Sequence, residues 1–160
     1  MKLLSSVVYA AIIGILAHYI GESLPRSWFC EKKFPYAVYV WEKGGRIYER
    51  IGIKVWKTRL PDMSRIMRDM LPKRVSPDNT SDSVTALIKE TCVAECVHYG
   101  LCFLAFGIYL IWKNYIGIIL TAVFIAGNIP FILIQRYNRP HLIRFRDRLL
   151  KREERNNCGS

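Results

Sequence analysis

The chain alternates between long apolar runs and long basic segments. Residues 3–20 contain a single strongly polar side chain, and residues 115–134 contain no charge at all. Between these two lies another apolar run, residues 93–112, which is the second in chain order and carries Glu95 and His98 near its start. Helices of this length can cross a hydrocarbon core of about 30 Å. The pattern therefore predicts an all-α integral membrane protein, with about three transmembrane helices in one membrane domain.

The segments outside these runs predict structure at the membrane surface. Residues 21–92 mix turn, aromatic and basic residues, and the apolar positions within 61–71 predict a short amphipathic helix. After the last run, residues 139–155 have the pattern of a basic amphipathic helix. Trp41 and Trp56 stand among basic residues, which suits contact with lipid headgroups. We therefore expect both tryptophans to take part in substrate binding.

The positive charge lies almost entirely in two segments. The chain has 24 Lys and Arg against 13 Asp and Glu, and all the basic residues except Lys2 and Lys113 lie within 21–92 or after 134. The positive-inside rule puts both segments in the cytoplasm. We therefore expect a multi-pass protein of the cell membrane, with its N-terminus outside and its C-terminus cytoplasmic.

The net charge of +11 also fits a nucleic-acid binder, because basic patches with interleaved aromatic rings contact phosphate backbones. Anchoring in a membrane makes lipid headgroups the more natural partner of the same residues. We therefore expect membrane lipids as partners and no nucleic acid.

Common catalytic and metal-binding motifs are absent from the sequence. It has no serine nucleophile elbow, glycine-rich phosphate loop, HExxH motif or dinucleotide fingerprint, which disfavours triad hydrolases and nucleotide enzymes. Cys92 and Cys96 are one helical turn apart but lack a second ligand pair, so we interpret them as packing thiols. No metal site is expected.

Three ionisable residues approach or enter the second apolar run: Glu90, Glu95 and His98. A charged side chain within a span costs about 2.5–3.5 kcal/mol on insertion scales, so its presence needs a reason. On a helix the three lie on one broad face, and Glu95 and His98 are i,i+3 neighbours. A histidine held by a carboxylate can take a proton from a hydroxyl. Catalysis and a polar clamp between helices both remain open.

A second polar cluster follows the third run, at Arg136, Tyr137, Asn138 and Arg139. Two guanidiniums with a phenol and an amide offer donors for a phosphate or a carbonyl oxygen. The alternative is a positive-inside stop signal, which needs arginine but neither tyrosine nor asparagine. The predicted topology puts both polar clusters at the same membrane face, where together they make a plausible active site.

Three blocks of sequence carry a family resemblance. They are Trp41-Glu42-Lys43-x-Gly45 through Tyr48 to Ile53-Lys54-x-Trp56-Lys57-x-x-Leu60-Pro61-Asp62, then Glu90-Thr91-x-x-Ala94-Glu95-x-x-His98, then Asn128-x-Pro130 with Gln135-Arg136-Tyr137-Asn138-Arg139-Pro140. Through these blocks the chain resembles the glycosyl-4,4′-diaponeurosporenoate acyltransferase family, small bacterial membrane enzymes of the staphyloxanthin carotenoid pathway. The chain departs from the family pattern at Cys92-Val93 and at His141, which bears on the acceptor more than on the reaction.

The resemblance implies transfer of a fatty acyl group from an activated thioester to a hydroxyl of a glycolipid, such as a glycosylated carotenoid. The donor would be acyl-CoA or an acyl carrier protein, and the thioester is a co-substrate, so no cofactor is expected. The implied catalytic residues are His98, as the base that Glu95 orients, and Glu90. Substrate contacts would come from Arg136, Tyr137, Asn138 and Arg139, and from Glu42, Lys57 and Asp62 on the cytoplasmic side.

Two other functions fit the same residues. One is a small membrane methyltransferase that acts on a lipid or prenyl-lipid with S-adenosylmethionine. The other is a non-catalytic lipid-binding protein in which both polar clusters only clamp helices together.

Overall fold

Helices make up all the regular structure of the part of the chain that is described. The computed structural model describes residues 1–57 and 80–158, and no strand occurs in those ranges. The elements in order are α1 (Lys2–Ser23), the 3₁₀ helices η1 (Arg26–Trp28) and η2 (Val40–Gly45), α2 (Arg46–Glu49), α3 (Ile53–Trp56), α5 (Ser81–Leu104), α6 (Phe106–Trp112) and α7 (Tyr115–Cys158). The predicted all-α class is confirmed. The amphipathic helix predicted over 61–71 lies outside the described residues.

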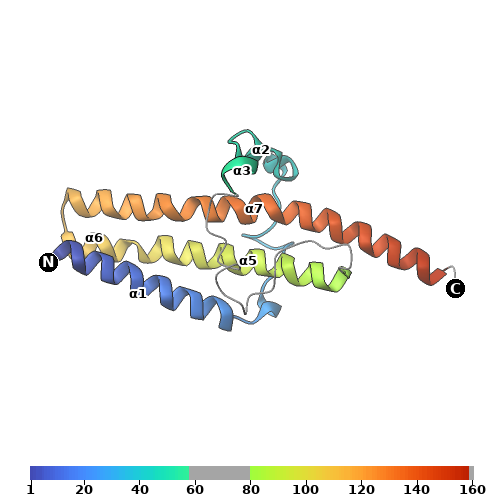
Figure 1. Ribbon diagram of the computed structural model, residues 1–160, viewed down its shortest axis with the longest axis horizontal. Coiled ribbons are helices and arrows are strands. Elements are labelled where there is room, and N and C mark those ends of the chain that lie inside the picture. The colour runs from blue at the N-terminus through green and yellow to red at the C-terminus, as the bar shows by residue number, and fades with distance from the viewer. Residues whose placement is uncertain (58–79, 159–160) are drawn as a thin grey trace.

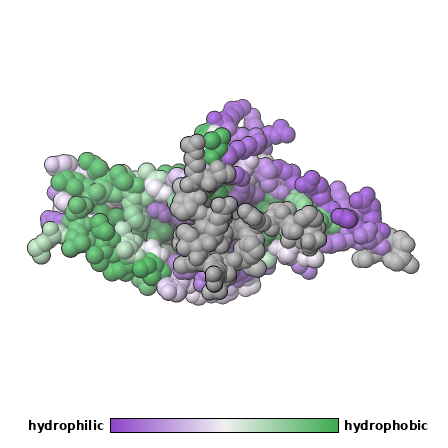
Figure 2. Space-filling model, viewed as in Figure 1, coloured by the Kyte–Doolittle hydropathy of each residue, from purple (hydrophilic) through white to green (hydrophobic). Residues whose placement is uncertain are grey.

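Three helical stretches are long and apolar enough to cross a membrane, as predicted: Lys2–Ser23, Ser81–Trp112 and Tyr115–Asn156. They run side by side, and the N-terminus and the connection from α6 to α7 lie at the opposite end of the molecule from the C-terminus (Figure 1). The visible surface around the N-terminal end is apolar, whereas the surface of the C-terminal part of α7 is hydrophilic (Figure 2). The polarity of the surface thus follows the long axis of the bundle.

The third predicted span and the predicted basic helix belong to one continuous helix. α7 is 44 residues long and contains Pro130 and Pro140. A proline inside a helix removes a backbone hydrogen bond and usually costs about 3 kcal/mol. α7 packs against α5 and remains one helix through both prolines. It changes direction toward its C-terminus (Figure 1). One helix therefore carries residues from the apolar end of the molecule to its hydrophilic end.

α1 packs closely against the second helical stretch. Ile13 and Ala17 of α1 form a buried cluster with Leu101 of α5. Farther along, the Tyr9 hydroxyl donates a hydrogen bond of 2.8 Å to the Leu104 carbonyl. A Cβ atom on Gly107 would lie 2.2 Å from that hydroxyl oxygen, so glycine is required for this approach.

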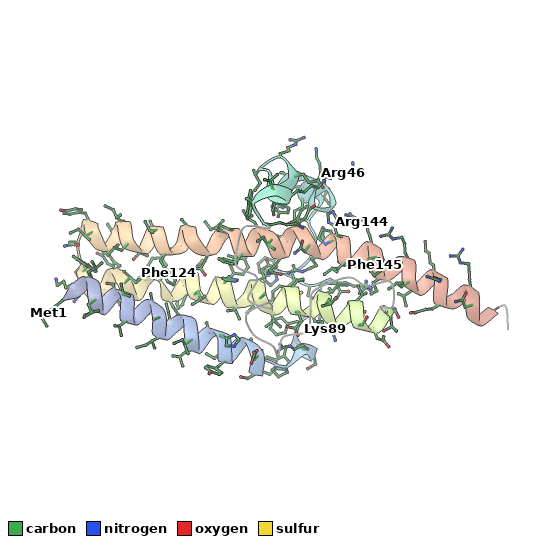
Figure 3. The ribbon with its side chains drawn as sticks, viewed as in Figure 1. Met1, Arg46, Lys89, Phe124, Arg144 and Phe145 are labelled. Carbon is green, nitrogen blue, oxygen red and sulfur yellow. The ribbon has the colours of Figure 1, made fainter. Side chains whose placement is uncertain are left out.

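The segment 29–45 connects the α5 side of the bundle to the α7 side. At one end Phe29 is buried against Cys92 and Val93 of α5. At the other end Gly45 has φ +94°, and a Cβ atom there would lie 3.2 Å from Pro140 Cγ in α7. Arg144 of α7 donates a hydrogen bond of 3.2 Å to the Gly44 carbonyl, close to Arg46, the first residue of α2 (Figure 3). This segment is therefore held at both ends.

Candidate active site

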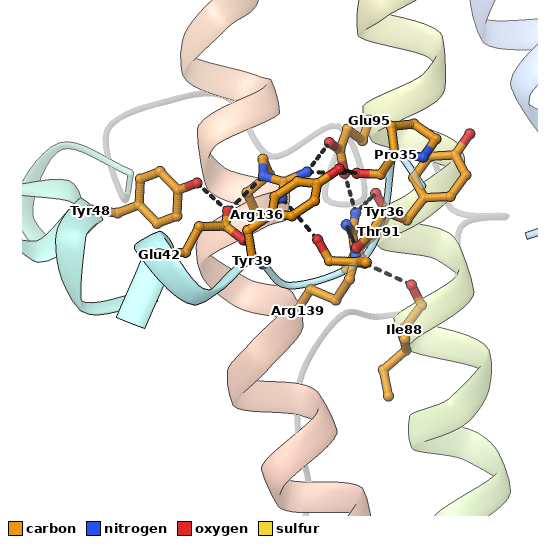
Figure 4. Close-up of polar contacts among 11 residues, drawn as sticks. Pro35, Tyr36, Tyr39, Glu42, Tyr48, Ile88, Thr91, Glu95, Arg136 and Arg139 are labelled. Atoms are coloured by element: carbon orange, nitrogen blue, oxygen red, sulfur yellow. Dashed lines mark hydrogen bonds and ion pairs between the residues drawn. The ribbon is translucent and has the colours of Figure 1, made fainter. Parts of the chain in front are cut away.

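Polar groups of α5, α7 and the segment 29–45 meet in one buried network (Figure 4). Helix α5 presents Glu95, and α7 presents Arg136 and Arg139, three residues apart on one face. The segment contributes Glu42 and several backbone carbonyls. Glu42, Glu95 and Arg139 are each at most 1% exposed. Burial of so many charges requires that each be paired and hydrogen-bonded.

Arg136 lies at the centre of the network. Its Nε and Nη2 atoms donate to the Glu42 carboxylate at 2.7 and 2.9 Å, and Nη1 donates to Glu95 Oε1 at 2.9 Å. The remaining hydrogens go to the Pro35 and Ala37 carbonyls, each at 3.0 Å. An arginine has five N–H donors. All five N–H donors of Arg136, which we predicted to contact substrate, are therefore bonded within the protein.

Arg139 makes a similar set of contacts one turn farther along α7. Its Nε and Nη2 atoms donate to the Thr91 hydroxyl at 2.9 Å and the Thr91 carbonyl at 3.0 Å. Nη1 donates to the Tyr36 carbonyl at 2.7 Å, and Nη2 also pairs with Glu95. The two arginines together fasten the segment 29–45 to α5 and α7. Their geometry is that of a structural clamp that frames a site.

The network is electrically balanced, since it contains two carboxylates and two guanidiniums. Burial alone would raise the pKa of Glu42, but the Arg136 guanidinium, the Tyr48 hydroxyl and the Tyr39 backbone N–H outweigh it and hold that pKa below its usual value. The Tyr48 hydroxyl donates to Glu42 Oε1, and the Tyr39 N–H donates to Oε2 at 2.7 Å. Glu42 is thus held ionised opposite Arg136.

His98 lies about one turn beyond Glu95 along α5, and the partner of its Nδ1 atom comes from α7. Nδ1 lies 2.9 Å from Asn128 Oδ1, and Asn128 Nδ2 donates to the Phe124 carbonyl at 2.9 Å. Because that second bond uses the amide donor, Oδ1 accepts from Nδ1–H, which leaves Nε2 as the nitrogen that can accept a proton. The ring stacks on Phe131 with centroids 4.8 Å apart. The side chain against Nδ1 is thus that of Asn128, whereas we predicted that Glu95 would orient the ring.

Glu90, predicted to lie near Glu95 and His98 in the site, makes a separate bidentate pair with Arg26. Arg26 Nε donates to Oε1 at 2.7 Å and Nη2 donates to Oε2 at 3.1 Å. Arg26 belongs to η1, so this pair ties the end of α1 to α5. Both carboxylate oxygens of Glu90 are therefore bonded to Arg26.

The predicted aromatic contacts lie at the edge of the network. Trp41 is exposed and stacks on the Tyr39 ring, with centroids 6.2 Å apart. Trp56 donates its indole N–H to the Ile51 carbonyl at 2.9 Å. Tyr137 is buried among the aromatic and aliphatic side chains of α2, α3 and α7. Asp62 lies outside the described residues.

Two hollows flank this network. The first is a cavity of about 390 Å³ lined by Lys57, Leu87, Thr91, Gln135, Asn138, His141, Leu142 and Phe145. The second is a mainly apolar groove of about 750 Å³ lined by Phe34, Pro35, Tyr39, Trp41, Ile47, Tyr48, Ile51, Tyr99, Ile132, Leu133 and Arg136. The predicted residues Lys57 and Asn138 thus line the cavity, whereas Trp41 and Arg136 line the groove.

Lys57 connects α3 to the cavity. Its Nζ atom lies 3.4 Å from Asn138 Oδ1 and 4.6 Å from the centre of the Tyr137 ring. Burial lowers the pKa of Lys57, and the nearby charge of Lys54 lowers it further. Lys57 therefore presents a partly desolvated ammonium group to the cavity.

The sequence reasoning missed several partners. The Pro35, Tyr36 and Ala37 carbonyls are backbone atoms, so no side-chain pattern reveals them. Thr91 had a usable signal, because it lies one helical turn before Glu95. Among the described residues, no group of three His, Cys, Asp or Glu side chains is arranged to hold a metal ion.

Comparison with known proteins identifies the family of the chain. The profile of the family described as glycosyl-4,4′-diaponeurosporenoate acyltransferase matches residues 25–148. A protein of that name from Staphylococcus haemolyticus is 30% identical over 132 residues, 82% of this chain and 77% of the relative. Another of that name from Staphylococcus aureus is 26% identical over 149 residues, 92% of this chain and 90% of the relative. No solved structure matches. The matched region contains every residue of the buried network, and the chain belongs to the glycosyl-4,4′-diaponeurosporenoate acyltransferase family.

Proposed function

We propose that this protein transfers a fatty acyl group from an activated thioester to a hydroxyl of a glycosylated lipid, with a glycosylated carotenoid as the leading acceptor. The observation that carries the proposal is the meeting of three distant sequence blocks at one site. Glu42 comes from the first block, Glu95 from the second and Arg136 from the third, and both carboxylates bond directly to the Arg136 guanidinium. This convergence supports a shared site for the activity that names the family.

His98 is the general base of the proposed reaction. Its Nε2 atom removes the proton of the acceptor hydroxyl while the hydroxyl oxygen attacks the thioester carbonyl carbon. The new C–O bond forms, and the C–S bond then breaks. The leaving thiolate takes the proton back from the imidazolium, which gives an ester and a free thiol. Asn128 is a positioning residue, because its amide holds the imidazole through Nδ1.

Arg136 and Arg139 support the site by fixing the position of the segment 29–45. Since their donors are bonded to Glu42, Glu95 and the segment 29–45, we assign them the task of holding that segment beside α5 and α7. Sites whose supporting residues are locked by hydrogen bonds keep reacting groups in productive geometry. Loss of either arginine would therefore act through the shape of the site.

The apolar groove suits the hydrocarbon chain of a lipid substrate. Ile132 and Leu133 line it from α7, and Tyr99, the neighbour of His98 in sequence, lines it from α5. Ile132 also follows Phe131, on which the imidazole stacks. A chain in this groove would lie against Tyr99 and Ile132, the sequence neighbours of His98 and Phe131.

The site belongs at the cytoplasmic face of the cell membrane in this proposal, with the N-terminus outside and the C-terminus inside. The basic segments 21–92 and 135–160 support this orientation through the positive-inside rule. Acyl-CoA or an acyl carrier protein would then reach the site from the cytoplasm.

The test is an acyl-transfer assay with the purified full chain in lipid nanodiscs. Wild type, His98→Ala and Asn128→Leu are mixed with a palmitoyl thioester of coenzyme A and glycosyl-4,4′-diaponeurosporenoate, and products are identified by mass spectrometry. We expect the acceptor to gain the mass of the acyl group. His98→Ala should lower kcat by about 10²–10⁴-fold, the usual contribution of a general base. Asn128→Leu should lower kcat with a smaller effect on KM.

His18→Ala is the matched control, because this histidine lies in α1 and pairs with Glu22. It should retain wild-type turnover. Wild-type turnover by an equally abundant and folded His98→Ala protein would remove His98 as the base. A methylated acceptor formed with S-adenosylmethionine, without acyl transfer, would refute the proposed reaction.

A further inference from the structure

His98 and the cavity beside Lys57 lie along one seam between α5 and α7. On α5, Thr91 lines the cavity and His98 follows two helical turns later, so both side chains leave the same face of the helix. On α7, Phe131 stacks on the imidazole, and Asn138, again two turns away, lines the cavity. At 1.5 Å per residue, about 10 Å along the helix axes separates the proposed base from the near end of the cavity.

The side chains along this seam can be reached from the surface of the bundle. Ala94 lies between Thr91 and His98 on the same face of α5, and it is half-buried. His98, Phe131 and Asn138 are half-buried as well. A ligand that lies along the seam can therefore contact the cavity at one end and the proposed base at the other.

Lys57 gives the near end of the cavity an unbalanced positive charge. Its side chain is half-buried, yet no carboxylate in the described part of the chain forms an ion pair with it. The arginines of the buried network, by contrast, all pair with carboxylates. Asn138 Oδ1 lies 3.4 Å from Lys57 Nζ, so the amide offers its Nδ2 hydrogens to other acceptors. An ammonium group beside an amide donor suits a phosphate.

The end of the cavity farthest from His98 has a different character. Leu142 and Phe145 of α7 line it together with Leu87 of α5. The guanidinium carbon of Arg148, an exposed residue, lies 5.7 Å from the centre of the Phe145 ring. An aromatic ring among aliphatic side chains suits the flat face of a nucleobase, and an arginine beside it suits a further phosphate. The volume of about 390 Å³ is within the roughly 300–1,000 Å³ typical of small-molecule sites.

We propose that this cavity binds the nucleotide end of a coenzyme A thioester, with the pantetheine arm along the seam and the thioester at His98. The inference rests on the proposed function for the reaction at that thioester. Between phosphorus and sulfur the arm has about thirteen bonds, which span about 14–16 Å when extended, at roughly 1.1–1.2 Å per bond. The arm is thus longer than the separation of about 10 Å between the cavity and His98. One donor molecule can occupy both places at once.

The test measures binding of the donor without turnover. The full chain in nanodiscs of neutral phosphatidylcholine is titrated by calorimetry with coenzyme A, with 4′-phosphopantetheine and with pantetheine, which lacks the phosphate. Lys57→Met removes the charge at similar side-chain length, and Lys57→Arg keeps it. Lys54→Met is the matched control, because Lys54 lies on the same short helix and pairs with Glu49 at the surface. The Tm of each variant reports its folding.

We expect Lys57→Met to weaken binding of coenzyme A and of 4′-phosphopantetheine about 10- to 150-fold, as for a hydrogen bond to a charged group. Pantetheine should bind Lys57→Met and wild type equally, because it has no phosphate for the ammonium group. Lys57→Arg should keep most of the affinity, and Lys54→Met should bind like wild type. Equal losses for the ligands with and without phosphate would overturn the proposal, since Lys57 would then act only through structure.

Two more variants test the arm and the nucleotide end. Ala94→Leu places a larger side chain on the seam and should weaken binding of all three ligands, whereas Ala122→Leu, at an exposed position of α7, should not. Phe145→Leu should weaken binding of coenzyme A alone, by about two- to twelvefold, because it removes an aromatic contact. Coenzyme A that binds wild type no more tightly than 4′-phosphopantetheine would overturn the nucleotide site and favour a carrier protein as donor.

The acyl-transfer assay separates this proposal from the proposed function. Lys57→Met should raise the KM for palmitoyl-coenzyme A and leave kcat and the acceptor KM unchanged. Acyl transfer with an unchanged donor KM would overturn the donor site while the proposed function stands. Binding of coenzyme A that depends on Lys57, without any acyl transfer, would support the donor site and count against the proposed function. Absence of coenzyme A binding to wild type would also overturn the donor site.

Discussion

Removal of the Arg136 guanidinium should loosen the segment 29–45 and lower the stability of the whole bundle. Arg136→Met abolishes two hydrogen bonds to Glu42, one to Glu95 and two to backbone carbonyls. Both carboxylates remain buried, Glu42 at 1% and Glu95 at 0% exposure. Loss of one partner from a buried ion pair costs about 3–5 kcal/mol, because the other charge is left uncompensated. At the usual scaling for a chain of this size, Tm should fall by roughly 6–20 °C.

The size of the loss should depend on Glu42. In the background of Arg136→Met, the further change Glu42→Gln removes the stranded carboxylate, so its own cost should shrink or reverse. The two substitutions should therefore be non-additive, with a coupling energy of about 1–3 kcal/mol. Arg152→Met serves as the control, because Arg152 is exposed, and it should change stability by no more than about 0.5 kcal/mol.

Thermal unfolding of wild type, Arg136→Met, Glu42→Gln, the double variant and the Arg152→Met control in one detergent, followed by tryptophan fluorescence, measures this coupling. Trp41 lies in η2, beside the network, so its emission reports the release of the segment. A Tm for Arg136→Met close to that of wild type would refute the reasoning. Additive effects of the two substitutions would refute it equally, since they would mean that the two charges do not depend on each other.

Two further predictions concern pH and helix packing. Because the folded pKa of Glu42 lies below its ordinary value of 4.5, its stabilising contribution is complete above that value and is lost as pH falls through the lower folded pKa. Tm measured from neutral to acidic pH should decline in that acidic window, and Glu42→Gln should flatten the decline; an unchanged slope would contradict this origin. Gly107→Ala should cost about 1–3 kcal/mol, because its Cβ atom would overlap the Tyr9 side chain. Gly100→Ala, where nothing lies within 4 Å of the new atom, should be neutral or slightly stabilising, and equal effects at both glycines would contradict the close packing.

Much of the architecture follows from the distribution of apolar residues. Three runs of about twenty residues are enough to predict three helices, because backbone polar groups in lipid must be bonded within the helix. The family blocks likewise point to Glu42, Glu95 and Arg136 as members of one site before any coordinates are known. The predicted span over 115–134 already contains Pro130, but its continuation through Pro140 into the basic helix was not predicted, since proline normally signals a break.

Which charged residues pair with each other was not predicted from the sequence. Helical spacing makes His98 a natural partner of Glu95, but that rule considers only neighbours on one helix. In the folded chain Glu95 meets two guanidiniums from α7, while His98 meets the amide of Asn128. A buried carboxylate is stabilised far more by cations than by a neutral ring, so Glu95 pairs with the two arginines.

The sequence by itself determined the helical class, the number of apolar spans, the asymmetry of charge and the set of polar residues available for chemistry. Those properties depend on short-range pattern and composition, which are written along the chain. Only the tertiary structure decided that Arg136 and Arg139 bond to the backbone of the segment 29–45 and that His98 Nδ1 lies against the Asn128 amide. Such choices depend on which groups from distant segments reach one another in a place without water, where every charge and every polar atom competes for the few partners within bonding distance.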